Sequence, residues 1–164
     1  MSISIRQLPD LQERAELLGC DIPEGICVFP RNFEVVETVD NLEYDDFAQT
    51  VKKLLQQAGL NSHGLKLANN KYLQQRENLP AICLFVGWTI STQDPTSVQL
   101  AINVIGNYLT DLFKGLRSER EQKCTFKIIR QRIKGKTQEF DELTYTGPIS
   151  GIPSLIEKLN DGSK

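Results

Sequence analysis

His63 is the only histidine of the chain, and it lies between Ser62 and Gly64 in a polar stretch. A histidine that acts as a general base needs a nucleophile and an orienting carboxylate within hydrogen-bond reach. The neighbouring sequence supplies neither, and the G-x-S-x-G pattern of a hydrolase nucleophile is absent. We therefore interpret His63 as an exposed loop residue and predict no catalytic residue. An enzyme that uses His63 within the polar loop 60–78 is kept as a third hypothesis.

The cysteines and the clustered acidic residues do not form a recognised metal-binding motif. Four cysteines occur far apart in the sequence, at Cys20, Cys27, Cys83 and Cys124. They form no C-x-x-C pair, so a zinc site is not expected. Two of them lie in apolar strand-like runs and no secretory signal is present, so we expect reduced core thiols rather than two disulfides. Four acidic residues lie close together, at Asp40, Glu43, Asp45 and Asp46. They lack EF-hand spacing, and helix capping by Asp45 or Asp46 is the simpler interpretation.

Nucleotide-binding motifs are also missing from the sequence. It contains neither G-x-x-x-x-G-K-[ST] nor G-x-G-x-x-G. We therefore predict no metal ion and no cofactor.

Charge is distributed unevenly along the chain, although the net charge is only −2. Residues Asp10–Asp46 carry eleven acidic and two basic side chains, whereas Lys114–Lys136 carries nine basic and two acidic ones. Opposite poles of this kind can dock a partner, bind nucleic acid at the basic end, or attract each other within one molecule.

A β-hairpin is predicted within the basic segment, with a strand at Cys124–Ile133, a tight turn at Lys134-Gly135 and a second strand at Lys136–Thr146. The candidate interaction residues of the segment 123–136 are its basic side chains, Lys127, Arg130, Arg132, Lys134 and Lys136.

The last four of these basic residues are two apart, so we expect them to line one face of the hairpin. The plainest interpretation is a solvated edge strand that uses charge to avoid edge pairing. Protein docking is the next interpretation. Nucleic-acid binding is less favoured because only Phe126 supplies an aromatic ring on that strand.

The apolar core must position this hairpin. The main part of the core is residues 79–115. Ala81–Ile90 is apolar on both faces, which predicts a central strand covered on both sides. Asp94-Pro95 then marks the start of a long, mostly buried helix that ends near Gly115. A membrane span is not expected, because Gln93, Asp94 and Asn103 interrupt the apolar stretch.

The remaining elements are shorter. Helices are predicted at Pro9–Leu18, at Tyr44–Ala58 and from Pro153 onward, and strands at Ile26–Val28 and Phe33–Val36. Residues 60–78 are expected to form a long polar loop with one helical turn near Lys71–Arg76, and residues 161–164 a loose tail.

The whole chain, residues 1–164, is therefore predicted to be a single α+β domain with elements in the order αβαβαββα. We expect a mixed sheet of four to five strands with helices packed on it. The strands at 81–90 and 124–133 are joined through the long helix and are expected to pair in parallel, while the hairpin adds an antiparallel edge. The N-terminus shows no secretory signal, so a cytoplasmic location is expected.

The C-terminal part of the chain resembles small uncharacterised bacterial proteins and effector-associated modules found beside conflict (defence) systems. The resemblance begins at Val98 and rests on AINVIGNYLTDLFKG and on FKIIRQRIKGKTQEFDELTYTGPISGIPSLIEKL. It implies an adaptor or accessory role without catalysis, and no functional residue is transferred from it.

These observations favour a non-catalytic, cytosolic, bacterial interaction or adaptor protein, an accessory component of a defence or signalling system. Its partner would be another protein or a second copy of itself, bound through a charged pole or a sheet edge, with no membrane involved. The alternative is a nucleic-acid-binding domain that uses the basic hairpin.

Overall fold

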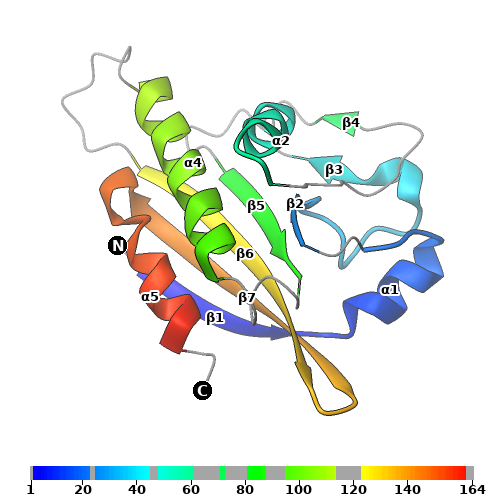
Figure 1. The fold of residues 1–164 in the computed structure, drawn as a ribbon. Helices are drawn as coiled ribbons and strands as arrows, with labels where there is room; N and C mark the ends of the chain where they lie inside the picture. The colour runs from blue at the N-terminus through cyan, green and yellow to red at the C-terminus, as the bar shows by residue number, and fades with distance from the viewer. Residues whose placement is uncertain are drawn as a thin grey trace.

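A five-stranded mixed sheet forms the centre of the molecule (Figure 1). The computed structural model describes residues 2–22, 25–44, 48–60, 71–72, 81–87, 95–113 and 123–161. In spatial order the strands are β1 (Ser2–Leu8), β7 (Thr137–Pro148), β6 (Lys123–Lys134), β5 (Ala81–Val86) and β2 (Ile26–Val28). β5 and β6 are parallel, and the other neighbours are antiparallel. The predicted α+β class, the mixed sheet and the parallel pair are therefore confirmed.

Helices and short segments surround this sheet. They are α1 (Leu11–Leu18), α2 (Ala48–Gln57), α4 (Pro95–Phe113), α5 (Ser154–Asp161) and the 3₁₀ turns η1 (Val39–Asn41) and η2 (Ile149–Gly151). A separate parallel pair consists of β3 (Glu43–Tyr44) and β4 (Lys71–Tyr72). Within the described residues, no helix has the length and apolar character needed to cross a membrane.

The sheet is covered on both faces, as its apolar central strand requires. On the face that we call the helical face, α2, α4 and α5 bury side chains such as Leu84, Phe126 and Tyr145. On the opposite face, α1 and the segment 29–42 bury a second set that includes Phe85 and Phe140. Because side chains alternate along a strand, β5 contributes to both clusters, which explains its continuous apolar sequence.

The position of the hairpin differs from the prediction. β6 and β7 lie inside the sheet, and its two edge strands are β1 and β2. The prediction failed because residues 2–8 form a strand that the sequence analysis did not identify, and this strand pairs with β7 along its whole length. The hairpin turn is also displaced by one residue, since Lys134 pairs with Thr137 and the loop residues are 135 and 136.

Two smaller expectations were also incorrect. Phe33–Val36 forms turns rather than a strand, with Phe33 and Val36 buried in the core and Val35 exposed. The helix expected from Tyr44 begins at Ala48 among the described residues, because Tyr44 belongs to β3.

Two further predictions concern segments that lie partly outside the described residues. Lys71–Tyr72 is strand rather than the start of a helical turn, and most of the 60–78 loop lies outside the described residues. Asp161 is the last residue of α5 rather than part of a loose tail, and residues 162–164 lie outside the described residues.

Candidate interaction surface

The outer edge of β1, which we call the β1 edge, is one of the two edges of the five-stranded sheet. β1 pairs with β7 on one side only, and no strand in the described part of the chain pairs with its other side. All of its side chains except Ile3 and Leu8 are exposed. An unpaired edge presents a row of N–H and C=O groups that can bind another extended chain.

The side chains of β1 do little to protect this edge. Proteins usually block edge strands with proline, outward lysine, bulges or a covering segment. The sequence SISIRQL contains no proline and no lysine, and its pairing with β7 is continuous. Its one charged residue is Arg6, whose Nη2 atom lies 2.7 Å from Oε1 of Glu34 and 3.4 Å from Oε1 of Glu142. The hydrogen bond to Glu34 is the largest contribution that raises the pKa of Arg6 above its ordinary value.

Ile5 is the exposed apolar residue of the β1 edge. It is 57% exposed. It shares the helical face with Ile3, because alternate residues of a strand project to the same side. Ile3 is partly buried against the main core. The β1 edge therefore combines accessible backbone with an apolar side chain.

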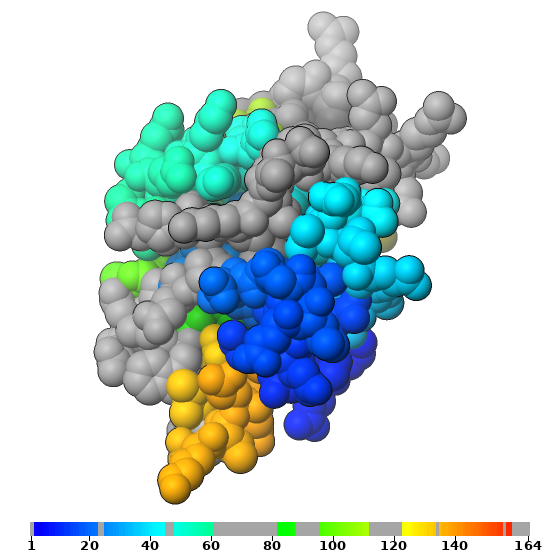
Figure 2. Space-filling model, turned by 90° about the vertical axis from the view of Figure 1, so that its right-hand side faces the viewer, coloured from blue at the N-terminus to red at the C-terminus, as the bar shows by residue number. Residues whose placement is uncertain are grey.

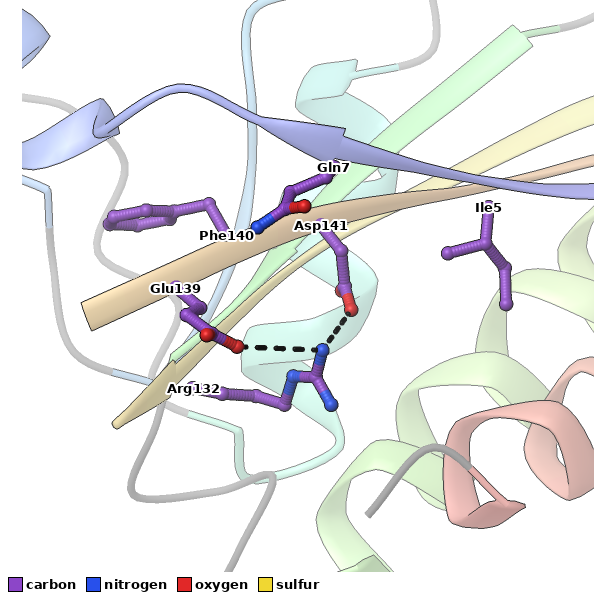
Figure 3. A pocket seen from close by; sticks show the side chains of 6 residues that line it. All are labelled: Ile5, Gln7, Arg132, Glu139, Phe140 and Asp141. Atoms are coloured by element: carbon purple, nitrogen blue, oxygen red, sulfur yellow. Dashed lines mark ion pairs between the residues drawn. The ribbon is translucent and has the colours of Figure 1, made fainter. Parts of the chain in front are cut away.

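A hollow of about 370 Å³ lies beside Ile5 on the sheet (Figure 3). Its lining residues come from the three strands β1, β6 and β7, and they are Ile5, Gln7, Arg132, Glu139, Phe140 and Asp141. A chain that extends the sheet at β1 would place alternate side chains next to Ile5 and Gln7, at the margin of this hollow.

Two arginines of β6 and two carboxylates of β7 form an ionic group beside this hollow. Nη2 of Arg130 lies 2.7 Å from Oδ2 of Asp141, and Nη2 of Arg132 lies 2.9 Å from the same oxygen. The contact between Arg132 and Glu139 is longer, at 4.0 Å (Figure 3). The pairs Arg130–Asp141 and Arg132–Glu139 are directly opposite in the strand register. The two positive and two negative charges balance one another locally.

This ionic group changes the interpretation of the predicted basic surface. Arg130 is buried and paired with Asp141, so its charge is not displayed to a partner. Lys127 projects to the opposite face, because its position alternates with Ile128 in the core of the helical face.

Arg132 is partly buried. The other two predicted residues, Lys134 and Lys136, lie at the end of the hairpin. Lys134 is the last residue of β6, and Lys136 is exposed in the turn, which projects beyond the body of the molecule (Figure 2). The structure therefore does not bring the five candidate residues into one continuous surface.

The acidic pole of the sequence is gathered in space around α1 and the segment 29–42 (Figure 2). Arg14 connects the two, since it donates hydrogen bonds to the backbone oxygens of Phe33 and Val36. Exposed carboxylates on this surface include Glu13, Glu16, Asp21, Glu37 and Asp40. Asp45, Asp46 and His63 lie outside the described residues.

The buried cysteines are poor nucleophiles. Burial raises the pKa of Cys27 to about 12 and that of Cys124 to about 11, so both thiols stay protonated at neutral pH. Cys20 is partly accessible, and its pKa is also raised, first by burial and second by Asp21. In the described segments, no group of three or more histidine, cysteine or acidic side chains is arranged to hold a metal ion.

Sequence reasoning missed β1 although its pattern is visible. Ser2 to Ile5 alternates polar and apolar residues with the period of a half-exposed strand. The stretch is short and its partner, β7, is more than 130 residues away in the sequence. The local pattern could have identified a strand, but it could not have shown that this strand forms an edge.

A scan against models of protein families finds no match for this chain, and searches of curated proteins and of solved structures find none either.

Proposed function

We propose that this chain is a non-catalytic interaction protein and that it binds a protein partner by adding a strand at the β1 edge. The observation that carries the proposal is the exposed seven-residue strand β1, which ends the sheet without proline, lysine or a bulge. In strand addition, main-chain hydrogen bonds supply affinity and alternate side chains supply specificity. The docking surface thus moves from the basic hairpin to β1.

The side chains near β1 support a protein partner over nucleic acid. Ile5 supplies apolar contact area at the edge, and the hollow beside it holds the carboxylates of Glu139 and Asp141 as well as Arg132. Phosphate binding relies on uncompensated positive charge. Because Arg130 and Arg132 are paired with carboxylates, the hairpin offers less free positive charge than its sequence suggests.

The wider biological role is part of the same proposal. We place the protein in the bacterial cytoplasm as an accessory or adaptor component of a defence or signalling system, with no cofactor and no membrane. The support for this role is the resemblance of the segment from Val98 onward. Strand addition at the β1 edge does not depend on this resemblance.

The test compares two single substitutions in tagged protein purified from its native cells. Ile5→Lys places a positive charge on the β1 edge, whereas Ile133→Lys makes the same change at an exposed isoleucine that is 40% accessible and lies in the hairpin. We expect Ile5→Lys to reduce recovery of a stoichiometric polypeptide partner by about tenfold or more, and Ile133→Lys to leave it unchanged. Equal recovery with all three proteins would overturn the proposal.

A further inference from the structure

We infer that the strand docked at the β1 edge is β1 of a second copy of this chain, paired antiparallel about a twofold axis. This inference rests on the proposed function, because it names the occupant of the same edge. A twofold interface uses the same surface on both copies, so the strand must be complementary to itself. The residues of β1 can therefore be tested for self-complementarity one register at a time.

Same-face residues oppose each other in an antiparallel pair, which limits the registers available. When the twofold axis passes through Ser4, Ile3 of each copy is opposite Ile5 of the other. Two isoleucine pairs then form on the helical face, and each covers one of the exposed Ile5 side chains. Cross-strand pairs of β-branched residues are favourable in sheets.

The registers with the axis on the C-terminal side of Ser4 are less favourable. With the axis at Ile5, Ile3 is opposite Gln7 and only one isoleucine pair forms. With the axis at Arg6, the two arginines oppose each other, and like charges directly opposite destabilise a sheet. The Ser4 register places Arg6 opposite Ser2 of the second copy, so that no like charges meet.

The other face of the sheet is compatible with the same arrangement. Ser2 and Ser4 project to this face together with Arg6, and both serines are exposed. Ser4 is small and lies beside Thr144 of β7, so at the axis the second copy meets short polar side chains, and its Ser2 lies opposite Arg6. Arg6 stays in its ion pairs with Glu34 and Glu142, which hold it on its own copy.

The register makes a geometric prediction that a chemical cross-link can test. Directly opposed residues of an antiparallel pair have Cα atoms roughly 4.5–5.5 Å apart, within the range that a disulfide spans. In the Ser4 register, position 4 is opposite itself, whereas position 2 is opposite position 6. Ser4→Cys should therefore form a disulfide between two copies, and Ser2→Cys should not.

The experiment uses full-length protein that also carries Cys20→Ser, because Cys20 is the partly accessible thiol among the four cysteines and the other three are buried. We expect mild oxidation to convert Ser4→Cys to a covalent dimer at least about tenfold faster than Ser2→Cys. Adding Ile5→Lys to the Ser4→Cys protein should slow this cross-link by a similar factor. Equal rates at positions 2 and 4, or no dimer at position 4, would overturn the inference.

Failure of the second-copy inference can be distinguished from failure of the proposed function. If native-cell recovery of a different protein depends on Ile5 while Ser4→Cys forms no dimer, the second copy is excluded and strand docking by a foreign partner stands. If recovery is unaffected by Ile5→Lys and no dimer forms, both proposals fall.

Discussion

Arg130 and Asp141 face each other across β6 and β7, with two hydrogen bonds of 2.7 and 3.0 Å between guanidinium and carboxylate. Their side chains are only 4% and 6% exposed. A buried charge is costly unless it is paired and hydrogen-bonded. This pair therefore supports the hairpin next to the hollow, and it explains why a basic sequence does not produce a basic surface here.

Removing Arg130 should destabilise the fold strongly. In Arg130→Ala, Asp141 keeps its contact with Arg132 but loses its bidentate partner in a buried environment. We expect a loss of about 3–5 kcal/mol in the free energy of unfolding, measured by urea denaturation. Lys136→Ala is the control, since this exposed residue should change stability by less than about 0.5 kcal/mol. Equal effects of the two substitutions would show that the pair contributes little.

The N-terminus of α1 should depend on Asp10. Its Oδ1 atom accepts hydrogen bonds from the backbone N–H groups of Gln12 and Glu13, at 2.9 and 3.2 Å. We expect Asp10→Ala to lower the free energy of unfolding by about 1 kcal/mol, because it leaves those donors without the cap. Asp10→Asn keeps an acceptor oxygen and should retain most of the stability. If thermal denaturation shows the same loss for both variants, the cap is not the cause.

The hairpin turn should depend on the backbone freedom of Gly135. This residue has a φ of +62° at the first position of the two-residue loop, as a type II′ turn requires. We expect Gly135→Ala to destabilise the protein by about 1 kcal/mol, although the added methyl group meets no atom within 4 Å.

Gly106 in α4 provides the matched control for the turn. It also has open space around the position of a Cβ atom, but it lies in a helix without a positive φ. Gly106→Ala should stabilise the protein by about 0.5–1 kcal/mol, since alanine favours helix. If chemical denaturation shows that Gly135→Ala destabilises the protein and Gly106→Ala stabilises it, the cost at Gly135 comes from its positive φ. Effects of the same sign would contradict it.

The buried thiols should make the fold sensitive to alkali. The pKa values of Cys27 and Cys124 are raised from an ordinary value near 9 to about 12 and about 11. Above about pH 9 the unfolded chain loses these protons while the folded chain keeps them, so stability falls as pH rises until the folded values are reached. Each thiol adds a slope of about −1.4 kcal/mol per pH unit within its window.

Cysteine substitution isolates this effect from other groups that titrate in alkali. We expect the decline in unfolding free energy between about pH 9 and 11 to be less steep in Cys27→Ala than in the unmodified protein. The comparison concerns slopes, so a constant cost of the lost side chain does not affect it. Parallel curves for the two proteins would argue against a protonated, buried Cys27.

Local sequence patterns predicted the elements whose own residues specify them. The apolar run at β5 and the Asp94-Pro95 start signal of the long helix identified the centre of the fold, and Gly135 marked the hairpin. The pairing of Arg130 depended on one residue of the turn. Starting the second strand at Lys136 pairs Arg130 with Glu139, whereas the observed start at Thr137 pairs it with Asp141.

The candidate site was harder to predict because it depends on contacts that are distant in sequence. β1 precedes its partner β7 by more than 130 residues, so no local pattern indicates that it closes the sheet beside the hairpin. Once β1 occupies that position, β7 is internal as well as β6, and the edge strand of the sheet is β1 with its exposed Ile5. The segment 2–8 thus decides which surface is available, although its own sequence is short.

Sedimentation velocity over a series of protein concentrations tests assembly through the β1 edge most directly. We predict that the unmodified protein and Ile133→Lys shift from monomer to dimer as concentration rises, and that Ile5→Lys remains monomeric over the same range. An unmodified protein that stays monomeric throughout, or an Ile5→Lys variant that dimerises equally well, would contradict this account.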